Sequence, residues 1–172
     1  MPYVDPQTID NPTTGQPIPA AWGDAVRDAL EFFAEPPQCS VSGSAVSSTS
    51  GNETILTAGS EAYDTDTMHS TASNTSRITC NTAGKFLFWG SVSFAANGTG
   101  YRRINYKLNG GSAVTILTVD AVATAGVPNT VLSFTFSVPL AVNDYVEISA
   151  HQLSGGPLDI TLREFGAVWQ SR

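Results

Sequence analysis

Apolar residues recur at three- and four-residue steps in only one stretch of the chain. The steps link Ile18, Trp22, Val26, Leu30 and Phe33, and they predict one amphipathic helix with a linker over residues 20–37. An isolated helix of this length is marginal in water, so it needs a surface to pack on. Three surfaces remain open: its own β domain, a second copy of the chain about a symmetry axis, or another protein.

From residue 38 onward the apolar residues alternate with period two. In one stretch Leu132, Phe134 and Phe136 alternate with Ser133 and Thr135, which predicts a strand with one buried face. Roughly eight to ten such strands, separated by turn signals such as Asn-Gly pairs, are typical of a sandwich, jelly roll or barrel. The pattern therefore predicts one antiparallel all-β domain over residues 38–172.

One predicted strand, near residues 85–95, is apolar on both faces. Phe86 and Phe88 mark one face, while Leu87 and Trp89 make part of the other face apolar as well. A strand that is apolar on both sides is covered on both sides, and in a small sandwich the second cover must come from a neighbour. Leu87 and Trp89, together with Trp169 in the last strand, are the candidate residues of a subunit interface.

The segment before the helix, residues 1–19, is rich in proline. It contains five prolines, Pro2, Pro6, Pro12, Pro17 and Pro19. Because proline fixes φ and has no amide hydrogen to donate, it excludes helix and central strand. The segment is predicted to be an extended arm that becomes ordered against a partner surface.

Charge and hydropathy exclude several classes of partner. The formal net charge is −7, from 15 acidic and 8 basic residues, and an acidic chain repels the phosphates of nucleic acids. No apolar run approaches the roughly 20 residues that a membrane-spanning helix needs. The first ten residues, MPYVDPQTID, lack the basic and apolar regions of a signal peptide, so synthesis in the cytoplasm is expected.

Few residues have the chemistry of a catalytic or metal site. Asp64, Asp66 and His69 lie close together in DTDTMHS, which allows a Ser-His-Asp site or a calcium loop, but there is no G-x-S-x-G motif and no EF-hand spacing. A solvated loop whose aspartates cap their own backbone is the favoured interpretation. We expect no enzymatic activity, no metal and no cofactor. Cys39 and Cys80 allow one disulfide, although buried free thiols are favoured in a cytosolic protein.

Four stretches of the β domain resemble one known family. AGKFLFWGSVSF (83–94), LNGG (108–111), LAVNDYVEIS (140–149) and FGAVW (165–169) are similar to strands and turns of the jelly roll shared by the complement globular head and tumour necrosis factor. Asn143 stands where that family usually has glycine. The resemblance implies an antiparallel jelly-roll sandwich that assembles as a homotrimer, and it implies little about function.

A narrower resemblance covers the helix and the first half of the β domain. TTGQPIPAAWGDAVRDALEFF (13–33) and the region 63–103 are similar to virion proteins of tailed phages that carry such jelly rolls. This resemblance implies a structural virion protein, assembled in the host cytoplasm and located on the capsid surface. Its expected partner is the major capsid protein, which the trimer would bind through the arm and the helix residues Trp22, Val26, Leu30 and Phe33.

Two other functions remain open at this stage. One is an adhesin on the tail or head fibre, whose jelly-roll head binds a host receptor or a glycan through exposed aromatic residues or loops. The other is a signalling ligand of the tumour-necrosis-factor type, which predicts a signal peptide or a membrane anchor.

Overall fold

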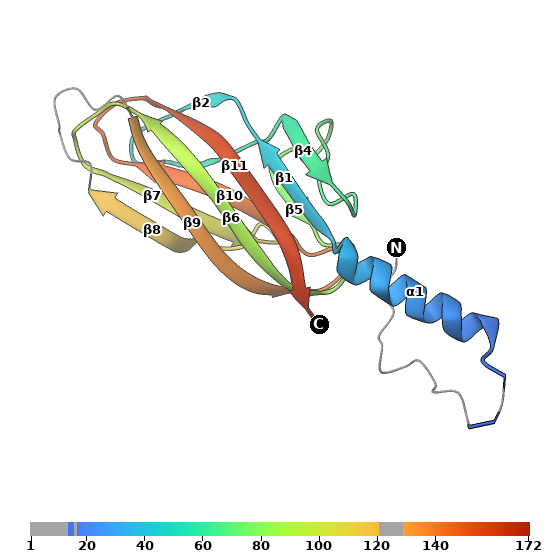
Figure 1. The fold of residues 1–172 in the computed structure, drawn as a ribbon. Coiled ribbons are helices and arrows are strands. Elements are labelled where there is room, and N and C mark those ends of the chain that lie inside the picture. The colour runs from blue at the N-terminus through green and yellow to red at the C-terminus, as the bar shows by residue number, and fades with distance from the viewer. Residues whose placement is uncertain (1–13, 16, 121–128) are drawn as a thin grey trace.

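A computed structural model describes residues 14, 15, 17–120 and 129–172, and these form one helix and two antiparallel sheets. The helix is α1 (Ala20–Ala34). Sheet A contains, in spatial order, β4 (Ser60–Asp64), β1 (Gln38–Ser42), β11 (Leu158–Ser171), β6 (Gly84–Ala95) and β9 (Asn129–Leu140), with β2 (Ala45–Ser48) also paired to β11. Sheet B contains β3 (Glu53–Ile55), β10 (Tyr145–Gln152), β7 (Tyr101–Leu108) and β8 (Val114–Asp120), with β5 (Arg77–Thr79) also paired to β10. The two sheets face each other as a sandwich (Figure 1), which confirms the predicted jelly-roll class.

The core lies between the sheets and is rich in stacked aromatic rings. Phe88 stacks on Phe136 at 5.1 Å between ring centroids, and Phe136 stacks in turn on Tyr106 of sheet B at 4.6 Å. Phe165 stacks on the other side of Phe88 at 5.8 Å. Each buried aromatic removes about 150–250 Å² from water, so this ladder joins the two sheets mainly through apolar burial.

The predicted alternation is confirmed in β9. Leu132, Phe134 and Val138 are buried, while Ser133 and Thr135 are exposed. The faces follow from the side-chain period of a strand, and the exposed hydroxyl residues belong to the outer face of sheet A.

The turn before β10 explains why asparagine replaces glycine there. Asn143 has φ of 72°, in the left-handed region, which asparagine tolerates better than other residues with a Cβ atom. The neighbouring turn uses a second asparagine, Asn109, whose Oδ1 accepts from the Tyr145 amide at 2.8 Å and whose Nδ2 donates to Asp144 at 2.7 Å. The departure from the family pattern therefore preserves the turn.

The two cysteines are free, as the sequence favoured, and both are buried. Burial raises the pKa of the Cys80 thiol to about 11 and that of Cys39 still further. Both thiols are therefore protonated at neutral pH and unreactive.

The helix ends close to its predicted C-terminus. The Glu35 amide caps it by donating a hydrogen bond to the Glu31 carbonyl at 2.9 Å, and Pro36 and Pro37 prevent its continuation. The chain then enters β1 at Gln38. Most of the predicted arm, residues 1–13 and 16, lies outside the described residues. No helix among the described residues is long and apolar enough to cross a membrane.

Candidate docking surface

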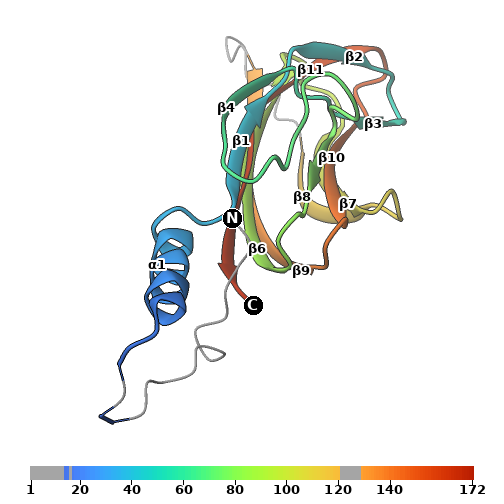
Figure 2. The same ribbon diagram turned by 90° about the vertical axis from the view of Figure 1, so that its right-hand side faces the viewer.

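Helix α1 contacts the sandwich at its C-terminal end. Phe32 is 3% exposed, and its ring meets Trp169 edge to face at 5.0 Å between centroids. Trp169 is held in place by its indole nitrogen, which donates to the Ala83 carbonyl at 3.2 Å. The rest of the helix extends beyond the end of the sandwich, on the side of sheet A (Figures 1 and 2). The ring of Phe33 also lies near Trp169, at 6.4 Å between centroids, so the contacts that anchor this projecting helix converge on Trp169.

The four residues predicted to bind a partner fall into two groups. Leu30 and Phe33 are 64% and 53% exposed, whereas Trp22 and Val26 are half-buried. The sequence analysis missed Phe32, the actual anchor. The signal was present, because Phe32 shares a helix face with the buried Ala29 at a spacing of three residues.

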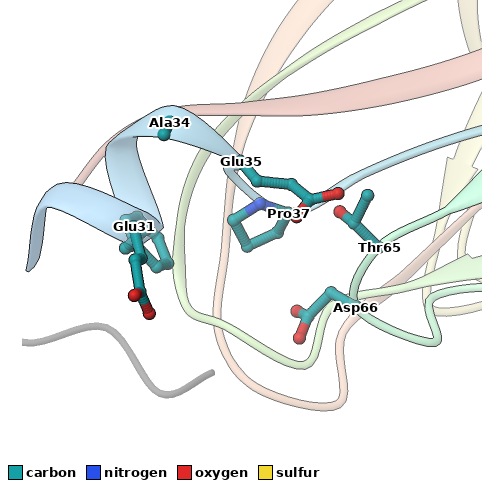
Figure 3. A pocket seen from close by; sticks show the side chains of 7 residues that line it. Glu31, Ala34, Glu35, Pro37, Thr65 and Asp66 are labelled. Carbon is teal, nitrogen blue, oxygen red and sulfur yellow. The ribbon is translucent and has the colours of Figure 1, made fainter. Parts of the chain in front are cut away.

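A pocket of about 440 Å³ lies between the end of α1 and the loop that follows β4. Figure 3 shows Glu31 and Glu35 of the helix region, together with Thr65 and Asp66 of the loop, around this pocket. Burial raises the pKa of Asp66. The acidic residues around the pocket make the C-terminal end of α1 negatively charged. The described residues contain no group of three or more His, Cys, Asp or Glu placed to hold a metal ion.

The outer face of sheet A is neutral and partly apolar. Leu87 and Trp89 lie on it and are half-buried, and Trp89 covers Gly166 of β11 so closely that a Cβ there would come within 2.3 Å of the indole. Between the row of Lys85 and the row that holds Glu164 and Ser91, the described outward side chains of sheet A are uncharged: Gln38, Ser40, Tyr63, Leu87, Trp89, Thr135, Ser137 and Val168. The exposed Arg163 and Glu164 mark the border of this neutral region.

Trp169 does not belong to this neutral face. It pairs in register with the buried Phe86, and it is 7% exposed because it packs on Phe32. The structure therefore keeps Leu87 and Trp89 together on the outer face and assigns Trp169 to the attachment of the helix.

The outer face of sheet B is charged and internally paired. Arg77 binds Glu147 at 3.4 Å, and Lys107 binds Glu53 at 3.3 Å. Burying such groups in an interface is costly, whereas neutral hydroxyl and apolar groups are cheaper to remove from water. Of the two outer faces, that of sheet A is the better suited to contact another copy of the chain.

Glu53 makes stability depend on pH. Partial burial alone would raise the pKa of Glu53, but hydrogen bonds from Ser149, Lys107 and Asn105 lower it below its ordinary value. The resulting stabilisation is present above the unfolded-state pKa of about 4.3 and is lost as pH falls through the lower folded-state pKa. We expect Glu53→Gln to flatten the fall in denaturation midpoint between about pH 5 and pH 3, with Glu35→Gln as the exposed control. An unchanged pH profile would contradict this assignment.

The candidate catalytic residues take structural roles. The Asp64 carboxylate accepts from the amides of Met68 and His69 at 3.0 and 2.8 Å, so it caps its own loop, as the sequence favoured. The ring of His69 is buried, with Nδ1 2.7 Å from Glu61 and Nε2 3.2 Å from the Thr75 carbonyl. Both ring nitrogens therefore contact acceptors that fix the loop, and within the part of the chain that the structure describes neither nitrogen contacts a serine hydroxyl.

Comparison with known proteins identifies the fold. No protein-family model matches the sequence, and no curated protein matches it either. Among solved structures, the globular domain of a zebrafish complement 1qA protein superposes with a TM-score of 0.57 at 17% identity, over 79% of this chain and 98% of that one. Murine APRIL superposes with a TM-score of 0.57 at 10% identity, over 78% and 98%. At these identities the chain shares the jelly-roll fold of both proteins, and the likeness shows the fold alone.

Proposed function

We propose that the chain is a non-enzymatic structural protein of a virion, which decorates the capsid shell as a homotrimer. In this proposal the outer faces of sheet A form the subunit contacts, and α1 with the preceding arm binds the major capsid protein. The jelly roll then forms the body of the trimer and faces away from the capsid shell.

The observation that carries the proposal is the exposure of apolar side chains on a projecting helix. The side chains of Leu30 and Phe33 are more than half exposed. They remain outside the apolar core of the sandwich. An exposed large apolar group is costly unless a partner covers it. A helix that presents such residues at three- and four-residue spacing fits an apolar groove on another protein.

Symmetry supports the same arrangement. A trimer built on the neutral faces of sheet A places three copies of α1 at one end of the particle, because α1 lies on that side and beyond one end of the sheet (Figure 2). Three equivalent helices match a site of threefold symmetry on a shell. Simultaneous binding by three weak contacts raises the overall affinity through effective concentration.

Leu30→Asp tests the role of the helix. We expect the full-length variant to stay folded, because Leu30 is exposed, and to lose at least tenfold in affinity for capsids assembled without this chain, because a buried hot spot contributes about 2 kcal/mol or more. The measurement is co-sedimentation with the capsids. Ala21→Asp, which adds the same charge at an exposed position on the other side of α1, is the matched control. Equal binding by Leu30→Asp and the wild-type chain would contradict the docking role.

An adhesin on a tail or head fibre is the second candidate function. It is favoured by a cluster of aromatic and cationic side chains at the end of the sandwich away from α1, described below. The two candidates differ in copy number, since an adhesin occurs a few times per particle and a decoration protein many times.

A further inference from the structure

Five outward-facing positions of sheet B and the residue that follows β10 form a compact group at the end of the sandwich away from α1. The register of β10, β7 and β8 places His151, Arg103 and Thr118 in one row. In the next row Tyr101 lies opposite Asp120, and the Leu153 amide donates to the Tyr101 carbonyl at 3.1 Å. Figure 1 shows β8 ending at this far end. We call the group formed by Tyr101, Arg103, Thr118, Asp120, His151 and Leu153 the distal patch.

Arg103 is a partly exposed cation that forms no ion pair with a carboxylate of residues 14, 15, 17–120 or 129–172. Its guanidinium carbon lies 5.0 Å from the centre of the Tyr101 ring, and its Nε donates to Thr118 Oγ1 at 3.2 Å. These two contacts fix the side chain and leave the two terminal amino groups without a hydrogen-bond partner among the described residues. Arg27, Arg77 and Lys107, by contrast, each bind an acidic residue.

The aromatic part of the patch is also fixed. Tyr101 stacks on His151 with 5.5 Å between ring centroids and 9° between ring planes. Nε2 of His151 lies 3.0 Å from the Gly51 carbonyl and so carries the donated hydrogen, while Nδ1 has no hydrogen-bond partner among the described residues. Leu153, beside this stack, is 45% exposed and adds an apolar contact surface.

Two buried side chains stabilise the base of the patch. Arg102, fully buried, donates to the carbonyls of Asn97, Thr99 and Tyr101 at 2.6–3.0 Å. Gln152, opposite Arg102 in register and equally buried, ties together the loops on either side through the Ser48 and Gly156 carbonyls, both at 2.9 Å. A surface fixed in this way loses little conformational entropy when it binds a ligand.

We infer that the distal patch binds a saccharide that carries a carboxylate group. The free fork of Arg103 matches the two oxygens of a carboxylate, with two parallel charge-assisted hydrogen bonds. Leu153 and the edge of Tyr101 offer apolar contact to a sugar ring, while Thr118 and Asp120 offer acceptors for its hydroxyl groups. A doubly charged phosphate suits the patch less well, because Asp120 lies within it and the whole chain carries a net charge of −7. The inference goes beyond the proposed function and does not depend on the trimer or on capsid binding.

The test measures binding of sialyllactose and lactose to the full-length protein by saturation-transfer difference NMR. These sugars differ by one carboxylated residue, so we expect sialyllactose to bind at least tenfold more tightly than lactose, which corresponds to one charge-assisted pair. Arg103→Gln should abolish that difference, and Arg103→Lys should restore only part of it because a lysine lacks the fork. Lys85→Gln, which removes an exposed charge from sheet A, is the matched control and should bind like the wild-type chain.

Three results would overturn the inference. They are equal affinity for sialyllactose and lactose, an unchanged preference in a folded Arg103→Gln variant, and tighter binding of mannose 6-phosphate than of sialyllactose. The circular dichroism spectrum of each variant confirms folding, and since Arg103 is partly exposed its replacement should leave the sandwich intact. A negative result here does not change the capsid-binding comparison of Leu30→Asp with Ala21→Asp. The saccharide site and the capsid-docking role can therefore be refuted independently of each other.

Discussion

Replacing Leu87 by aspartate should prevent the proposed trimer from forming and leave the protein as a monomer. Leu87 lies on the neutral outer face of sheet A, in the row next to Lys85, opposite Ser137 of β9 and Val168 of β11. In a trimer packed on this face, each subunit would bury an unpaired carboxylate, at a cost of about 3–5 kcal/mol per site. That cost corresponds to a loss of at least hundredfold in the affinity of each contact.

Sedimentation velocity measures this change directly. The wild-type protein should sediment with a mass close to three times the chain mass of 18.1 kDa. The Leu87→Asp variant should sediment with the mass of a single chain. Ile55→Asp is the matched control, because Ile55 is 41% exposed and lies on sheet B. A trimeric Leu87→Asp variant, or a monomeric Ile55→Asp variant, would show that sheet A does not form the contact.

Replacing Phe32 by alanine should release the helix from the sandwich. Phe32 is the residue of α1 that joins the hydrophobic core, against Trp169. Truncating a buried phenylalanine costs about 3–5 kcal/mol, which is more than a helix of this length gains from its own propensity. The loss should therefore appear as local unfolding of α1 rather than as unfolding of the whole domain.

Hydrogen exchange distinguishes local from global unfolding. In Phe32→Ala the amides of α1 should lose protection, while those of β6 and β11 keep theirs. Phe33→Ala, next in sequence but 53% exposed, should change the exchange of α1 much less. Equal protection of α1 in Phe32→Ala and the wild-type chain would mean that contacts other than Phe32–Trp169 hold the helix.

The sheet faces followed from the sequence because a strand has a side-chain period of two. Over residues 132–138 of β9 the apolar and hydroxyl residues alternate without a break, so Phe134 could be assigned to the core and Thr135 to the outer face before the structure was known. The two apolar faces of β6 likewise placed Leu87 and Trp89 on the outer side. Trp169 could not be placed in this way, since its surroundings depend on where α1 ends in space.

The helix shows a second limit of sequence patterns. The rings of Phe32 and Phe33 both contact Trp169, and periodicity alone does not say that Phe32 is the one that becomes buried. The distal patch shows a third limit of sequence patterns. Arg103 and Thr118 lie on the consecutive strands β7 and β8, whereas His151 comes from the distant strand β10, and only the observed register brings the three together. The sequence pattern therefore could not predict that Arg103 stacks on Tyr101 with terminal amino groups that no other described residue binds.

The number of chains that saturate one capsid tests the proposed function most directly. Capsids assembled without this chain would be mixed with the full-length protein, pelleted, and analysed for bound chain over a range of concentrations. Decoration predicts saturation at a large number of copies per particle, in multiples of three, with an increase in the melting temperature of the shell by linkage. No saturable binding to capsids would contradict decoration and leave the adhesin as the remaining candidate.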